Sequence, residues 1–187
     1  YDFKPHIIVS SIEHPAVLTT AKFLKKHGID LSIAPVNKNG VIDIEELKKL
    51  IRKETVLISV MYANNEIGTI QPIKEIGDIA EKNNIIFHSD MVQAAGKIDI
   101  DLNSLKVNLA TFSGHKINAP KGIGILYMDE KGKDFIVPLI HGGHQENGFR
   151  AGTEDFIGIC ALGKACEIHL RDMEKDNLIV KKLRDYF

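Results

Sequence analysis

The feature that most constrains the fold is an alternation of short apolar runs with amphipathic segments along the 187 residues. The runs are rich in β-branched residues and have strand length. They lie at residues 6–11, 31–36, 55–62, 85–90, 109–113 and 123–128. Strands that alternate with helices indicate an α/β fold. Continuous apolar strands, covered on both faces, further indicate a mostly parallel central sheet flanked by helices.

Helix signals fall between these runs. Residues 15–27 carry apolar side chains at helical spacing, and Asp43 followed by Glu46 predicts a capping box that opens a helix over residues 44–52. Pro72 fits the first position of a further helix. Each predicted helix joins two predicted strands, as an α/β sheet requires.

Composition narrows the class of protein. A hydrophobic content of 44% supports one sizeable core, and a net charge of −1 gives no excess that would favour nucleic acid or a membrane surface. We expect a soluble, cytoplasmic protein. Cys160 and Cys166 lie six positions apart in an apolar helical stretch, so we expect both to be buried and inert. His141 and His144 have no supporting metal-ligand spacing, and no metal site is predicted.

Polar side chains cluster where two neighbouring strands should end, and ligands of such sheets collect beyond those ends. Asp90 closes the fourth strand and Gln93 follows it, while Ser113, His115 and Lys116 follow the fifth. Alone, such an aspartate is often a cap and such a lysine is often solvated. Together they match pyridoxal 5′-phosphate (PLP), which needs an amine, an anion for the pyridine nitrogen and donors for the phosphate.

The motif Ser113-Gly114-His115-Lys116, followed by Pro120-Lys121-Gly122-Ile123-Gly124, resembles the lysine-bearing signature of the class V aminotransferases. The chain is most similar to the cysteine desulfurase branch of that family, the NifS/IscS type. Four further motifs match its order and spacing: Glu13-His14-Pro15-Ala16-Val17, Asn64-Asn65-Glu66-Ile67-Gly68, His88-Ser89-Asp90-Met91-Val92-Gln93 and Arg150-Ala151-Gly152-Thr153.

The resemblance implies roles for residues around the pyridine ring of PLP. His14 would stack on the ring and move protons, and Asp90 would hold the pyridinium. Asn65 and Gln93 would reach the phenolic oxygen and the substrate side. A turn pair after a strand is the alternative for the two asparagines, and it is the stronger alternative for Asn64.

The resemblance also implies how the rest of the cofactor is held. Ser113 and His115 would bind the phosphate, beside Gly114 where the backbone can approach closely. Lys116 would form the Schiff base. Thr153 would reach the phosphate bound by a partner subunit, which implies a homodimer.

The implied fold is the large domain of the fold type I PLP-dependent transferases. We expect residues 1–160 to form the PLP-binding large domain, without its N-terminal part. Residues 161–187 would lead toward a small C-terminal domain. A phosphate loop is expected before residue 1. The nucleophilic cysteine and the substrate-binding arginine are expected beyond Phe187.

The implied activity is removal of sulfur from L-cysteine, giving alanine and an enzyme persulfide for iron–sulfur scaffold proteins or other acceptors. Without the nucleophilic cysteine, we expect the chain to be inactive on its own. Two alternatives remain open. One is a non-catalytic PLP-fold module for binding or dimerisation, and the other is a different class V enzyme such as a selenocysteine lyase or an aminotransferase.

Overall fold

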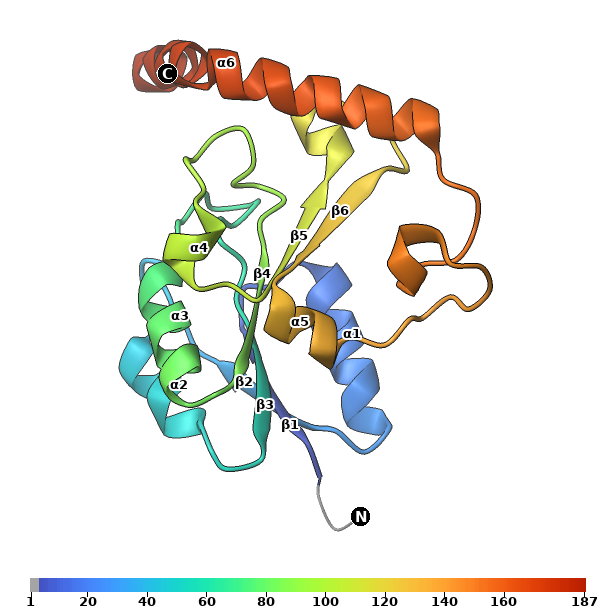
Figure 1. Cartoon of the computed structure of the whole chain (residues 1–187). Coiled ribbons are helices and arrows are strands. Elements are labelled where there is room, and N and C mark those ends of the chain that lie inside the picture. Colours follow the sequence, from blue (N-terminus) through green and yellow to red (C-terminus); the bar gives the residue numbers. More distant parts are fainter. Residues whose placement is uncertain (1–3) are drawn as a thin grey trace.

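A six-stranded sheet with the order β2-β1-β3-β4-β5-β6 forms the centre of the molecule (Figure 1). The structure, a computed structural model, describes residues 4–187. The strands are β1 (His6–Ser10), β2 (Asp30–Ala34), β3 (Thr55–Ser59), β4 (Ile86–Asp90), β5 (Leu109–Ser113) and β6 (Gly124–Met128). Each lies in a predicted apolar run or within one residue of it, so the α/β prediction is confirmed.

The sheet is parallel from β2 to β5, and only β6 runs antiparallel to its neighbour β5. The connection from β5 to β6 is too short for the crossover that a parallel pair requires. The second strand ends at Ala34, earlier than the prediction of residue 36, because Pro35 has no N–H group for the ladder.

Helices cover both faces of the sheet. They are α1 (Pro15–Lys26), α2 (Ile44–Leu50), α3 (Ile73–Lys82), α4 (Leu102–Leu105), α5 (Glu130–Phe135) and α6 (Phe156–Tyr186). Ile7 and Val9 of β1 pack with α1, whereas the intervening Ile8 belongs to the larger core with α2 and α3. Because successive strand residues point to opposite faces, α1 and the α2–α3 pair lie on opposite sides of the sheet.

The cap of α2 forms only half of the predicted capping box. Asp43 Oδ1 accepts hydrogen bonds from the N–H groups of Glu45 and Glu46, both at 3.1 Å. The side chain of Glu46 instead pairs with Lys49 at 2.7 Å. Pro72 is the N-cap residue of α3, so the helix begins at Ile73, one position after the predicted start.

The strand order creates a switch point between β1 and β3. The chain leaves β1 through α1 toward β2, and it leaves β3 through α3 toward β4, which lies on the opposite side. Adjacent strands whose connections diverge leave a crevice at their carboxyl ends, where such sheets bind ligands.

The last helix corrects one expectation. Its buried residues Gly158, Leu162 and Ala165 form one face, which packs near Ile117, and α6 crosses the molecule at the carboxyl end of β5 (Figure 1). Both cysteines of this helix are exposed, so the prediction that they are buried was wrong. A helix that contacts the body along one face leaves its other faces in solvent. The helix also spans the expected boundary after residue 160, and that division remains a prediction.

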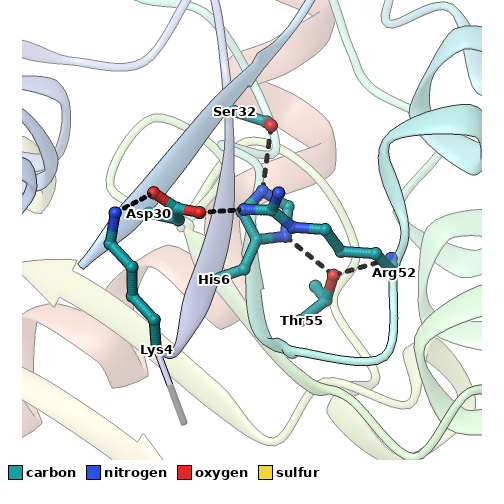
Figure 2. A network of polar contacts seen from close by, with 6 residues as sticks. All are labelled: Lys4, His6, Asp30, Ser32, Arg52 and Thr55. Atoms are coloured by element: carbon teal, nitrogen blue, oxygen red, sulfur yellow. Dashed lines mark hydrogen bonds and ion pairs between the residues drawn. The ribbon is translucent and has the colours of Figure 1, made fainter. Parts of the chain in front are cut away.

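A polar network lies at the amino end of β1, away from the switch point (Figure 2). His6 is fully buried; its Nδ1 lies 2.8 Å from Thr55 Oγ1 and its Nε2 lies 2.9 Å from Ser32 Oγ. Thr55 Oγ1 also accepts from the Arg52 N–H, and Arg52 pairs with Asp30 at 2.6 Å. Burial lowers the pKa of His6, which favours the neutral imidazole. Through the two ring nitrogens of His6, the network joins β1 to β2 and β3.

Candidate cofactor site

A cavity of about 650 Å³ opens at the carboxyl ends of β1, β3, β4 and β5. Seven of the eight site residues predicted from the sequence line it: His14, Asn65, Asp90, Gln93, Ser113, His115 and Lys116. They come from four separate stretches of chain. The eighth residue, Thr153, is exposed in the segment before α6 and lies outside the lining that the described residues form.

Asp90 closes β4 and is 8% exposed. Its Oδ1 accepts a hydrogen bond from the Val92 N–H at 3.0 Å, so the residue also caps the turn that follows the strand. Its main-chain oxygen accepts from the Tyr62 N–H at 2.9 Å. The first contact orients the carboxylate, the second holds the backbone at the strand end, and both Asp90 and Gln93 line the cavity.

The segment after β5 forms a 3-10 turn, η1 (Gly114–Ile117), that places three polar groups on the rim. Ser113 Oγ lies 2.8 Å from His115 Nδ1, and both His115 and Lys116 are exposed. A Cβ on Gly114 would clash with Ile123, so internal packing explains this glycine. The hydroxyl, imidazole and amine therefore project from one short, rigid turn.

His14 is the N-cap residue of α1 and lines the cavity. Its Nδ1 accepts from the Ala16 N–H at 3.2 Å and caps the helix. A ring nitrogen that accepts a hydrogen bond carries no proton, so in the neutral ring the proton is on Nε2. The cap therefore determines which nitrogen can donate.

Three cavity residues were missed from the sequence. Ser59 Oγ lies 2.8 Å from His88 Nδ1, and His88 Nε2 lies 3.3 Å from Thr111 Oγ1, so His88 bridges β3, β4 and β5. Burial lowers the pKa of His88 to about 4, which keeps the ring neutral. The available signal was its position two residues before Asp90, which puts both side chains on one face of β4.

Glu13 was also missed; it lies outside the cavity lining and is 5% exposed. Its Oε1 accepts hydrogen bonds from the Ser10 hydroxyl and, at 2.7 Å, from the Met61 N–H. Its Oε2 is buried and has no hydrogen-bond partner among residues 4–187. Burial raises the pKa of this carboxyl to about 7, and the charge of Asp90 acts in the same direction.

The two asparagines of the loop after β3 have different surroundings. Asn64 Oδ1 accepts from the N–H groups of Glu66 and Ile67 at 2.9 and 3.0 Å, which is the turn role left open above. Its Nδ2 donates to the Ile12 carbonyl oxygen at 3.0 Å. Asn65 is exposed and lines the cavity.

The cavity continues from this polar rim into an apolar lobe between α1 and the sheet. Ile7 and Val9 of β1 form its floor, and Val17, Ala21 and Leu24 of α1 form its wall. The charged and hydrogen-bonding groups therefore lie at the carboxyl edge of the strands, whereas the deeper part offers only dispersion contacts.

Residues 4–187 hold no group of three or more His, Cys, Asp or Glu side chains that could bind a metal ion. In the same part of the chain, no helix combines the length and the apolar character needed to cross a membrane.

A parallel sheet with a lysine, an aspartate and a Ser–His pair around its switch-point cavity defines a candidate PLP-binding domain. Residues 2–186 match the model of the family described as Aminotransferase class-V. The chain belongs to this family.

Within this family, the chain is similar to curated cysteine desulfurases. The chain is 52% identical over 180 residues to a cysteine desulfurase IscS of Methanosarcina thermophila and 49% identical over 182 residues to one of Dictyoglomus turgidum. These alignments cover 96% and 97% of this chain but 44% and 46% of the relatives. The chain therefore spans about half the length of the curated relatives that it matches.

Solved structures agree with this comparison. A NifS-like protein matches with a TM-score of 0.88 and 44% identity, over 92% of this chain and 47% of that one. A structure described as SspA in complex with cysteine matches with a TM-score of 0.84 and 44% identity, over 88% of this chain and 47% of that one. The likeness thus extends over nearly the whole chain.

Proposed function

We propose that this chain forms the cofactor-binding part of a PLP-dependent cysteine desulfurase, an enzyme that removes sulfur from L-cysteine and leaves alanine. One observation carries the proposal: a single cavity brings together Lys116, Asp90 and the Ser113–His115 pair from the ends of β4 and β5. The family match and the cysteine desulfurase relatives support it.

The residues present fit PLP. The cavity volume lies within the range of about 300–1,000 Å³ usual for cofactor sites. The amine of Lys116 is suited to hold the cofactor aldehyde covalently, and the carboxylate of Asp90 is suited to keep the pyridine nitrogen protonated. The Ser113 hydroxyl and the His115 imidazole are suited to the phosphate oxygens. When bound, PLP supplies an electron sink for charge that develops on the substrate α-carbon.

The remaining residues would orient the cofactor and supply a proton to the substrate. His14 would lie over the pyridine ring, with the proton on Nε2 available to the substrate because Nδ1 caps α1. Asn65 and Gln93 would donate to the phenolic oxygen of the cofactor and face the substrate. Asp90 is held by the Val92 N–H, so its carboxylate need not reorganise when charge develops.

The sulfur-accepting thiol is proposed to lie elsewhere in the full-length enzyme. Cys160 and Cys166 are exposed on α6, and neither lines the cavity. Thr153 is proposed to contact the phosphate of a partner subunit in a homodimer. Delivery of sulfur to an iron–sulfur scaffold or another acceptor, and a cytoplasmic location, are part of the same proposal.

Borohydride reduction of the PLP-loaded full-length protein tests the proposal. Peptide mapping should place the cofactor on Lys116, and Lys116→Ala should abolish both the label and the visible absorption band. Lys121→Ala is the matched control, because this exposed lysine lies five positions further on and outside the cavity lining. A label on Lys97, whose pKa is lowered by partial burial and by the charge of Lys116, would overturn the assignment.

A further inference from the structure

Two loops diverge at the switch point, and each carries one of the residues proposed to contact the cofactor. The loop after β1 carries His14 and continues into α1, and the loop after β3 carries Asn65 and continues toward α3 on the other face. The β1–β3 ladder pairs residues only as far as Val9 and Ser59. Backbone pairing between the strands therefore does not fix the distance between the two loops.

One link between the loops is made by Glu13. The N–H groups of Val60 and Tyr62 bond to main-chain oxygens at the end of β4. The intervening Met61 N–H points toward β1, which has already turned away, because the Ser11 N–H donates to β2. Glu13 Oε1 accepts from Met61 at 2.7 Å and so takes the place of the missing strand.

The second link is made by Asn64 in the opposite direction. Its Nδ2 donates to the Ile12 carbonyl oxygen at 3.0 Å, while its Oδ1 holds the turn of its own loop. Each loop thus contributes one side chain that binds the backbone of the other. Glu13 and Asn64 are adjacent in sequence to the cavity residues His14 and Asn65.

We infer that Glu13 and Asn64 form a reciprocal latch that positions His14 relative to Asn65 across the switch point. Both are positioning residues, because they act on the cofactor through their neighbours. The inference rests on the proposed function. Beyond that function, we infer that the two loops do not place His14 and Asn65 independently, because the hydrogen bonds of Glu13 and Asn64 join the loops.

The test uses the PLP-loaded full-length enzyme and two latch variants. Asn64→Asp keeps the turn acceptor but replaces the donor to Ile12 by a second acceptor, and Glu13→Ala removes the acceptor for Met61. Each should weaken PLP binding about tenfold, as expected for the loss of one buried hydrogen bond. Each should also shift the visible absorption band of the bound cofactor. Glu13→Gln should stay within about twofold of the wild type, because its amide oxygen can still accept.

Asn37→Asp is the matched control. Asn37 Oδ1 holds a similar turn by accepting from the N–H groups of Asn39 and Val41, and Asn37 does not line the cavity. This substitution should leave the dissociation constant and the absorption band unchanged.

A comparison of backgrounds separates positioning from general destabilisation. In a His14→Ala, Asn65→Ala background the latch has nothing left to position, so adding Asn64→Asp should weaken PLP binding no further. Full additivity there, or unchanged binding in both latch variants, would overturn the inference. If the wild-type label is not on Lys116, the proposed function fails instead, whatever the latch variants show.

Discussion

Replacing Glu13 by glutamine should change how the stability of the fold depends on pH. The unfolded carboxyl loses its proton near its ordinary pKa of 4.5, whereas the folded one keeps it until about pH 7, because burial raises the pKa. The contribution of Glu13 to the free energy of unfolding is therefore fully present below pH 4.5. It falls as the pH rises to about 7 and is then constant. Glutamine carries no such proton and should show no such fall.

The size of the effect follows from the two pKa values. Each pKa difference of one corresponds to about 1.4 kcal/mol, so ionising Glu13 in the folded state costs about 3 kcal/mol above pH 7. Between pH 5 and pH 8, the wild type should lose roughly 2 to 3 kcal/mol of unfolding free energy relative to Glu13→Gln.

Urea unfolding of the chain at a series of pH values measures this difference. Glu174→Gln is the matched control, because it makes the same change at an exposed position of α6 and should follow the wild-type curve. Parallel stability curves for wild type and Glu13→Gln across this range would show that the buried carboxyl does not titrate there. The assignment of its raised pKa would then be refuted.

Three further predictions concern the site and the packing. In the full-length enzyme, Asp90→Asn should retain the fold and cut turnover at least about a hundredfold, because an amide does not hold the pyridine nitrogen protonated; near-normal kcat would contradict its role. In the native chain, Cys160 and Cys166 should both react with a thiol reagent without denaturant. The chain alone should release no sulfide from L-cysteine. Thiols that do not react, or sulfide release that the Cys160→Ala, Cys166→Ala double variant abolishes, would contradict this prediction. Gly77→Ala should destabilise the chain by about 1–3 kcal/mol, because the added methyl group meets a backbone carbonyl of α4. Gly163→Ala adds its methyl group in open space and should stabilise the chain by roughly 0.5–1 kcal/mol. Equal melting temperatures of the two variants would refute the packing argument.

The sequence by itself determined the elements and the chemistry of the site. Strand and helix positions followed from periodicity, which is a local property, and the polar residues Asp90 and Lys116 stood at strand ends that a parallel sheet brings to one edge. The strand boundaries moved by up to three residues where backbone pairing, and not composition, decided them. At the end of β2, Pro35 stops the ladder before the apolar run ends.

Only the tertiary structure decided which residues support that chemistry. Glu13 meets Met61 across 48 positions, and His88 meets Ser59 across 29, so neither pairing leaves a local pattern. The burial that raises the pKa of Glu13 is likewise a sum over many distant neighbours. Cys160 is exposed because another face of α6 packs against the rest of the molecule. An apolar stretch of sequence does not by itself show which helix face is buried. Local spacing fixes what each residue can do, and long-range contacts fix which residue it acts on.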